Sequence, residues 1–230
     1  MTLTMKRFWK DVTIDAKRVV RLDGKPVRTP GRVPLALPSN ALAQAIAEEW
    51  RAITGNVDPR AMLLTGLANA AIDRITPKPE AFAAGLAEYA ESDLLCYRAE
   101  GPPELIARQQ AAWDPLLAWA AQHYDVRFVT VTGVMHRAQP PATIARLGAA
   151  MAAHRAFTLA ALSPIVTITG SLVGALALAE RATDAETLWR AAHIDEDWQA
   201  ELWGADPLAE AARETRRRDY DAAVRFLAIG

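Results

Sequence analysis

The sequence predicts an α+β fold, in which a small antiparallel β-rich N-terminal domain precedes a larger helical C-terminal domain. Three observations support this prediction. Short runs of alternating apolar and polar residues occupy the start of the chain, alanine-rich segments with helical periodicity occupy most of the rest, and the pattern has changed fully by Asp58-Pro59. We therefore expect a β-rich domain at residues 1–58, including a helix from about residue 39, and a helical domain at residues 59–230.

The predicted sheet rests on residues 10–38, "KDVTIDAKRVVRLDGKPVRTPGRVPLALP". Asp23-Gly24 and Pro30-Gly31 separate its alternating runs, and Asp-Gly is a dipeptide that a tight hairpin turn favours. The pattern changes at Ser39, where "SNALAQAIAEEW" begins with a residue type that caps helices and continues with apolar residues at helical spacing. Two strands around Asp23-Gly24 and a helix starting near Ser39 are therefore expected.

The remainder of the chain predicts a series of helices. Prolines at 77, 102, 140 and 164 are typical of their boundaries. The expected helices span Arg60–Ile75, Lys78–Ala90, Pro103–Tyr124, Pro141–Leu162, Ser171–Ala182, Asp184–His193 and a long C-terminal segment. Between them, Val126–Val134 is rich in β-branched residues and predicts a short strand or an extended connector.

The segment Ala156–Ala179 carries no charge and contains Gly170-x-x-x-Gly174, so by length it could span a bilayer. Ser163-Pro164 interrupts it, however, and several hydroxyl side chains reduce its apolarity. A buried pair of helices broken at Pro164 is the favoured interpretation. We expect no stable membrane insertion.

Composition restricts the function further. The chain has 230 residues, 51% of them hydrophobic, and its 26 basic and 27 acidic residues give a net charge of −1. Such a balance produces no overall field for nucleic acid, which is not expected as a partner. The single cysteine, Cys96, precludes an internal disulfide and favours a reducing compartment. Asp11 and Asp15 near the N-terminus, without an apolar run of signal-peptide length, argue against secretion and against a transit peptide.

Motifs for nucleotide, nucleophilic or metal chemistry are missing from the sequence. Gly24-Lys25 lacks the upstream glycine of a P-loop, and neither G-x-G-x-x-G nor G-x-S-x-G occurs. Cys96 is expected to be a small buried apolar residue. The four histidines are separated by ten or more residues, and the His193–Glu196 pair occurs once only. We predict no catalytic residue, no metal and no cofactor.

The segment "HIDEDWQAELWG", His193 to Gly204, concentrates four carboxylates and two tryptophans. One interpretation is an enzyme that uses this acidic cluster as metal ligands or as an acid/base pair, with His193, Asp197 or Glu201 meeting a distant residue such as His154. Against it, consecutive carboxylates on a helix point in different directions, toward solvent or toward basic groups such as Arg213 and Arg216–Arg218. Tryptophans surrounded by charge are typical of a surface that binds another protein.

Several segments, in this order and spacing, resemble the ATP-twelve family of assembly chaperones for the catalytic sector of the F-type ATP synthase. They are "KRFWKDVTID", "VRLDGKPVRTP", "LALPSNALAQAIAEEW", "LANAAID", "ESDLLCYRA", "WDPLLAW", "GSLVGALAL" and "DEDWQAELWG". The similarity extends from about Arg7 to about Asp219. It implies a β-rich N-terminal and a helical C-terminal domain, no enzymatic activity, and a chaperone that binds the free alpha subunit and shields its beta-subunit-facing surface.

The resemblance also implies where the partner binds. An acidic residue of the C-terminal motif matters for function in the family, and Glu196 is the position that matches it best. The flanking sequence here is Ile-Asp-Glu-Asp and not a run of glutamates. The predicted partner-binding residues are Asp195, Glu196, Asp197, Trp198, Glu201 and Trp203.

Localisation follows from the same resemblance. Without a transit-like leader the chain is similar to the bacterial members, so a cytoplasmic location is expected, whereas related eukaryotic members act in the mitochondrial matrix. The oligomeric state is left open.

Overall fold

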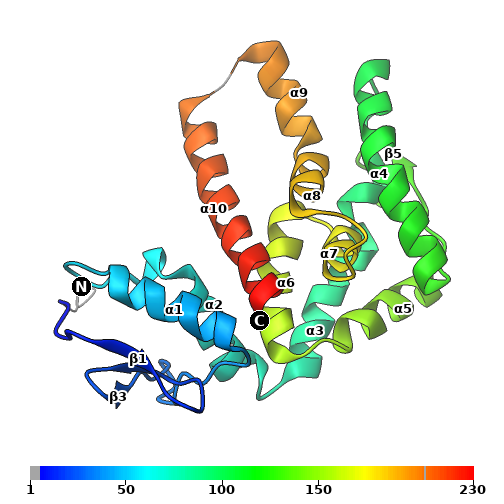
Figure 1. Ribbon diagram of the computed structural model, residues 1–230. Helices are drawn as coiled ribbons and strands as arrows, with labels where there is room; N and C mark the ends of the chain where they lie inside the picture. The colour runs from blue at the N-terminus through cyan, green and yellow to red at the C-terminus, as the bar shows by residue number, and fades with distance from the viewer. Residues whose placement is uncertain (1–5, 205) are drawn as a thin grey trace. The chain divides into compact units, whose positions relative to one another are not determined.

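The computed structural model describes residues 6–204 and 206–230 (Figure 1). It confirms the α+β class, with a small antiparallel sheet near the N-terminus and mostly helices after it. The described residues form two compact units. The first comprises the chain up to Pro79 together with Arg155–Ala161 and Ala222–Gly230, and the second comprises Glu80–His154 and Leu162–Asp221. The domain boundary predicted after Asp58 stays a prediction.

The sheet of the first unit contains three antiparallel strands, and the predicted turn joins two of them. The strands are β1 (Val12–Ile14), β2 (Val20–Leu22) and β3 (Lys25–Pro26), in the order β1-β2-β3. Asp23 and Gly24 form the turn between β2 and β3 with φ angles of 47° and 79°, a left-handed pair that favours Asp-Gly. The Asp23 carboxylate also accepts hydrogen bonds from the backbone N–H groups of Lys10 and Asp11, at 3.0 and 2.8 Å.

The first helix begins where the sequence predicts it. Ser39 precedes α1 (Asn40–Ala52), and its hydroxyl accepts a hydrogen bond from the Leu42 N–H at 3.0 Å. The side chains of Leu42 and Ile46 are fully buried. Trp50, at the end of the same helix, contacts Trp9 with ring centroids 5.2 Å apart. The apolar face of α1 therefore contributes much of the core of this unit.

A helical segment follows α1 within the first third of the chain. A 3-10 turn at Pro59–Ala61 precedes α2 (Leu63–Ala70), which continues into a π-helical turn at Ala71–Ile75. The predicted helix Arg60–Ile75 is therefore confirmed in position, although three helical types share it. Asp73 in the π-helical turn accepts hydrogen bonds from the Thr29 hydroxyl at 2.6 Å and the Gly31 N–H at 2.7 Å. These contacts hold the predicted Pro30-Gly31 turn against the helix.

The remaining elements of the chain are predominantly helical (Figure 1). The helices are α3 (Pro79–Ala87), α4 (Pro103–Tyr124), α5 (Pro141–Ala152), α6 (Ala156–Thr169), α7 (Leu172–Ala179), α8 (Ala185–Ala192), α9 (Ile194–Trp203) and α10 (Pro207–Ile229). Two 3-10 turns, at Glu88–Ser92 and Leu94–Cys96, follow α3. The predicted helix Lys78–Ala90 is therefore α-helical only as far as Ala87.

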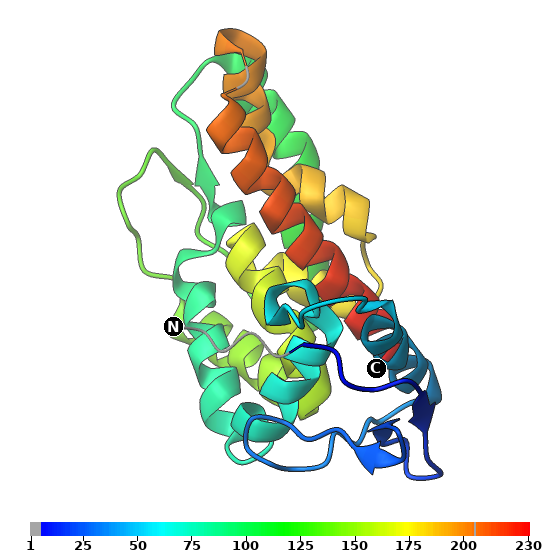
Figure 2. The same ribbon diagram turned by 90° about the vertical axis from the view of Figure 1, so that its left-hand side faces the viewer.

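The extended segment predicted at Val126–Val134 contains a short strand. β5 (Val131–Thr132) pairs in parallel with β4 (Tyr97–Arg98), which follows the second 3-10 turn. The extended segments that contain these strands lie on the same side of the second unit, at the left of Figure 2. The pairing brings the loop after β5 close to the segment that precedes α4.

The predicted helix Pro141–Leu162 and the predicted break at Pro164 are both wrong. The chain forms two helices in the first region, because α5 ends at Ala152 and α6 begins at Ala156. Pro164 lies inside α6, and the break comes at Gly170, whose φ of +65° is incompatible with continuing the helix. Ser171 then caps α7 by accepting a hydrogen bond from the Gly174 N–H at 2.8 Å. Among the described residues, no helix has both the length and the apolarity needed to cross a membrane.

A buried carboxylate fixes the start of α7 in the second unit. Asp93 is fully buried and accepts hydrogen bonds from the Leu95 N–H at 3.0 Å and the Val173 N–H at 2.9 Å. Burial raises the pKa of Asp93 to about 6, although these hydrogen bonds oppose the shift. One side chain therefore caps both a 3-10 turn and a helix that lies 80 residues further along the chain.

Candidate partner-binding site

The helix that carries the acidic cluster, α9, starts at a buried histidine. His193 stacks on Trp189 with ring centroids 3.8 Å apart, and its Nδ1 lies 2.8 Å from the Trp189 carbonyl oxygen. Because a carbonyl oxygen only accepts hydrogen bonds, Nδ1 carries the hydrogen. Burial lowers the pKa of His193, so the ring is neutral at physiological pH. His193 therefore joins α8 to α9 and serves as a structural residue.

Two of the three consecutive carboxylates contact α10. The Glu196 carboxylate accepts two hydrogen bonds from Arg216 Nη2, at 2.7 and 2.9 Å, and Asp197 forms an ion pair with Arg213 at 2.5 Å. The sequence left two outcomes open for these carboxylates, solvent or basic groups such as these arginines, and the structure shows the second for Glu196 and Asp197. In Figures 1 and 2, α9 lies beside the first half of α10. These partly exposed ion pairs link the two helices.

The other polar residues of α9 contact α4. Asp195 accepts a hydrogen bond at 2.7 Å from the Gln109 side-chain amide, and the buried Gln109 in turn accepts one from the Ala99 N–H at 2.8 Å. Glu201 forms an ion pair with Arg108 at 2.8 Å, which lowers the pKa of Glu201. Asp195 and Glu201 thus contact α4, whereas Glu196 and Asp197 contact α10.

The tryptophans of the cluster differ in their exposure. Trp198 is partly buried and stacks under Arg108, whose guanidinium carbon lies 4.8 Å from the ring centroid. Trp203, at the end of α9, is 77% exposed, and the neighbouring Leu202 is 55% exposed. A large aromatic side chain left in water is a feature of surfaces that bind a partner.

The carboxylates of the predicted site therefore divide between contacts with α4 and contacts with α10, and they do not meet at one point. Asp197 and Glu201 contact arginines on different helices, and the buried His193 is bonded to the backbone. Among residues 6–204 and 206–230, no group of three or more histidine, cysteine, aspartate or glutamate side chains is placed to hold a metal ion. Burial raises the pKa of Cys96 to about 12, so this thiol is not activated as a nucleophile.

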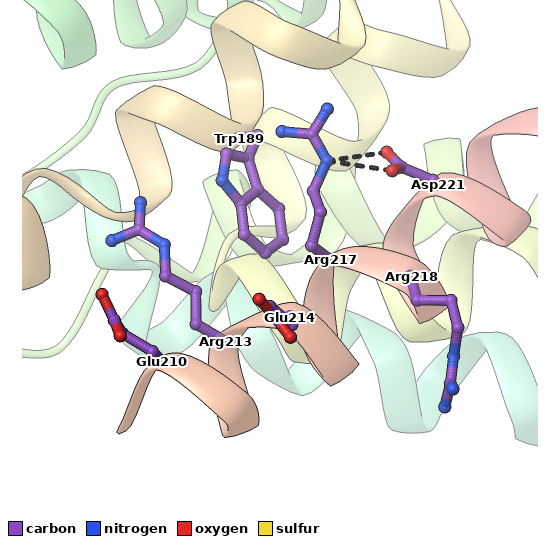
Figure 3. A pocket seen from close by; sticks show the side chains of 7 residues that line it. All are labelled: Trp189, Glu210, Arg213, Glu214, Arg217, Arg218 and Asp221. Atoms are coloured by element: carbon purple, nitrogen blue, oxygen red, sulfur yellow. Dashed lines mark hydrogen bonds and ion pairs between the residues drawn. The ribbon is translucent and has the colours of Figure 1, made fainter. Parts of the chain in front are cut away.

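Three hollows surround α9 and the first half of α10. A groove of about 590 Å³ separates α9 from the segment Leu94–Leu105, and a hollow of about 630 Å³ lies between α9 and α10. The third, of about 610 Å³, has Trp189 at its base (Figure 3). Its lining charges balance, because Arg213, Arg217 and Arg218 are matched by Glu210, Glu214 and Asp221.

Within the third hollow, Arg217 is held in place by several contacts. It pairs with Glu186 at 2.8 Å and with Asp221 at 2.9 Å, and its guanidinium carbon lies 5.1 Å from the Trp189 ring centroid. Figure 3 shows the contact between Arg217 and Asp221. The two carboxylates offset the charge of the guanidinium group and leave little attraction for a further anion.

Sequence reasoning missed the residues of other segments that complete the surroundings of α9. Arg108 and Gln109 contact α9 across 93 and 86 residues of chain, and Val134 lines the same groove as Trp203. Arg108 and Gln109 belong to a segment whose apolar residues have the usual spacing of a helix. No local signal in the sequence distinguishes them from other polar residues on a helix surface.

Comparison with known proteins places this architecture in the class of chaperones. A family model described as ATP12 chaperone protein matches residues 6–121, which is just over half of the chain. The chain therefore belongs to the ATP12 chaperone family. The acidic segment of α9 lies beyond the matched residues, but solved structures cover it.

Three solved structures are similar over nearly the whole chain. Atp12 from Paracoccus denitrificans is 41% identical and has a TM-score of 0.90, with 98% of each chain covered. A variant of Atp12p from the same organism, in which an aspartate is replaced by lysine, is 41% identical with a TM-score of 0.92 and covers 98% of this chain and 97% of that one. A protein from Agrobacterium tumefaciens, described as a candidate chaperone, is 43% identical with a TM-score of 0.91 and covers 97% of this chain and 85% of that one.

Proposed function

We propose that this protein is an assembly chaperone of the F-type ATP synthase that binds the free alpha subunit of the catalytic sector. It shields the surface of that subunit that later faces a beta subunit. The observation that carries the proposal is the similarity to Atp12 of Paracoccus denitrificans, which extends over 98% of both chains at 41% identity. The sequence resemblance supplies the identity of the client.

The physical basis of such a function is the protection of an apolar surface. A subunit that has not yet bound its partner exposes apolar surface, and the subunit aggregates through this surface unless another protein covers it. The binding surface proposed for this role comprises Asp195, Glu196, Asp197, Trp198, Glu201 and Trp203 of α9. The exposed Trp203 supplies apolar contact area, and the carboxylates select a client surface of opposite charge.

Catalysis, metal ions and cofactors have no part in the proposed function. Binding and release of a client require only that the beta subunit compete for the same surface. The proposed location is the bacterial cytoplasm, where the chaperone meets newly made alpha subunit. The absence of a cofactor and the cytoplasmic location both follow from the proposed role, and they would have to be abandoned if that role were disproved.

The proposal is tested with purified alpha subunit of the ATP synthase from the same source. We expect the full-length protein to retain the alpha subunit in a pull-down and to reduce light scattering when that subunit is diluted from denaturant. The isolated beta subunit serves as the comparison client and is expected not to be retained. A natively folded protein that does not bind the alpha subunit would contradict the proposal.

A further inference from the structure

The groove between α9 and the segment Leu94–Leu105 is the hollow that carries exposed apolar side chains. Val134 is 93% exposed, Trp203 is 77% exposed and Leu202 is 55% exposed, and all three line this one groove. They come from α9 and from the loop after β5, which are distant in sequence. Exposed apolar side chains that gather in one place mark a surface that a partner covers.

The charges that line the same groove are negative after internal pairing. Arg98, its basic residue, is buried and forms an ion pair with Asp114 at 2.5 Å. Asp195 and Glu100 are exposed carboxylates, and within residues 6–204 and 206–230 no lysine or arginine nitrogen lies within 4.0 Å of either. A partner that supplies cations would therefore gain favourable electrostatic interactions here.

The two carboxylates have different neighbours. Asp195 accepts its hydrogen bond from Gln109, a neutral amide that orients the carboxylate without cancelling its charge. Glu100 lies over Gly133, whose φ is +83°. A Cβ at that position would be 2.7 Å from Glu100 Oε1. Glycine thus allows the carboxylate to lie against the loop that carries Val134. The groove therefore presents two negative charges beside apolar surface, and Gln109 orients one of them.

The other two hollows near α9 have fewer exposed apolar side chains in their linings. In the hollow between α9 and α10 the carboxylates of Glu196 and Asp197 are paired with Arg216 and Arg213, and the charges around Trp189 balance. The hollow between α9 and α10 also contains the carboxylates of Asp206 and Glu210, but Trp203 is the one large exposed apolar side chain among the described residues of its lining. The groove beside α4 has three such side chains and therefore offers the most exposed apolar contact area of the three hollows.

We propose that this groove is one part of the client-binding surface, and that it takes an apolar segment of the client that carries lysine or arginine. The inference rests on the proposed function, because the client is the alpha subunit. Val134, Leu202 and Trp203 contact the apolar side chains of the segment. Asp195 and Glu100 contact its cations.

Apolar contact is tested with single variants whose controls are equally exposed. Val134→Ser and Trp203→Ala change groove residues, whereas Met135→Ser and Leu208→Ser change side chains that are 77% and 81% exposed but do not line the groove. Isothermal calorimetry with purified alpha subunit measures the affinity. We expect the two groove variants to bind at least about tenfold more weakly and the controls to bind as the unaltered protein does.

Charge is tested by the salt dependence of the same affinity. The double variant Glu100→Gln/Asp195→Asn keeps the shapes of both side chains, and Glu104→Gln is the control because Glu104 is exposed near the groove without lining it. Between about 50 and 300 mM NaCl the unaltered protein and the control should lose affinity. The double variant is expected to bind more weakly at low salt and to show a flatter dependence.

Hydrogen exchange provides a readout that does not depend on any variant. Addition of alpha subunit should slow exchange of the backbone amides of residues 97–101, 198, 199, 202 and 203, which line the groove. If the unaltered protein binds the alpha subunit while the groove variants bind equally well and these amides are unprotected, the groove proposal is overturned and the proposed function stands. If the unaltered protein does not bind the alpha subunit, both are overturned.

Discussion

Gly31 shows how a single residue without a side chain permits a contact that fixes a turn. The Asp73 carboxylate bonds to the Gly31 N–H and the Thr29 hydroxyl, and a Cβ on Gly31 would lie 2.6 Å from Asp73 Oδ1. Glycine is required at this position because any side chain would collide with the Asp73 carboxylate, and not because the backbone is left-handed. The contact joins the strand-rich segment to the π-helical turn within one unit.

We predict that Gly31→Ala lowers the free energy of unfolding by about 1–3 kcal/mol, because Asp73 must move and its two hydrogen bonds are lost. Gly55→Ala is the control, since a Cβ at Gly55 meets no atom within 4 Å. Urea denaturation of both variants measures the difference. Equal stability of the two variants would show that the Asp73 contact contributes nothing.

Glu196 has two possible roles, contact with the client and attachment of α9 to α10. Its two hydrogen bonds to Arg216 lie on a partly exposed surface, where an ion pair contributes about 0–1 kcal/mol. Loss of that pair alone is therefore too small to unfold the helix pair. A large effect of a Glu196 substitution on client binding would have to come from a direct contact.

The two roles separate in a charge exchange. We predict that Glu196→Arg weakens alpha-subunit binding, and that the exchanged pair Glu196→Arg/Arg216→Glu regains the stability of the unaltered protein but not its affinity. Thermal unfolding followed by circular dichroism gives the first quantity and a pull-down titration the second. Restored binding in the exchanged pair would assign Glu196 a purely structural role.

At the scale of elements, two aspartates cap helices in opposite electrostatic environments. Asp93 is buried and its pKa is raised to about 6, whereas the exposed Asp184 accepts hydrogen bonds from the Thr187 N–H and hydroxyl, which lower its pKa. The folded state therefore holds a proton on Asp93 in a pH range where the unfolded chain has lost it. Asp184 behaves in the opposite way, because the folded state releases its proton at a lower pH than the unfolded chain does.

These shifts predict opposite pH dependences for two matched variants. The stability contributed by Asp93 is full below about pH 4 and falls as the pH rises to about 6, so the stability of Asp93→Asn relative to the unaltered protein should improve by about 1–3 kcal/mol over that range. The matched variant is Asp184→Asn: Asp184 contributes stability above its unfolded pKa and loses it as the pH falls through the lower folded pKa, so this variant should become relatively less stable as the pH rises. Urea unfolding at several pH values measures both. A parallel response of the two variants would contradict the assignment.

The differences between expected and observed helices also arise at this scale. Ser39 and Asp23-Gly24 were predictable because capping and turn formation depend on residues within a few positions. The predicted break at Pro164 is wrong because an internal proline costs one backbone hydrogen bond, and in α6 the packing of neighbouring side chains outweighs that cost. Residues around Pro164, such as Ile165 and Val166, are fully buried, and this packing retains the helix despite the lost hydrogen bond.

For the whole molecule, the proposed function makes a prediction about competition. If the chaperone covers the surface of the alpha subunit that a beta subunit later occupies, both cannot bind at once. We predict that added beta subunit releases the chaperone from the alpha subunit in a concentration-dependent manner. Size-exclusion chromatography of the mixture measures the release, with bovine serum albumin as the control protein. A stable complex of all three proteins would contradict the shielding role.

The sequence by itself determined the α+β class, the first hairpin, the cap of the first helix and the resemblance to a chaperone family. Each of these depends on periodicity, on residues close together in the chain, or on the order of motifs. It also placed Glu196 and Asp197 next to candidate arginine partners, two of which the structure confirms. The two residues of each of these ion pairs are no more than about twenty positions apart in the chain.

Only the tertiary structure decided how the acidic segment is divided. Asp195 and Glu201 contact Gln109 and Arg108, which are 86 and 93 residues away, and the groove includes a loop from yet another segment. Contacts at such separations depend on how helices pack, and packing is set by the fit of many side chains at once. For that physical reason the sequence predicted a surface on α9, and the fold determined which side of α9 carries exposed apolar residues and unpaired negative charge.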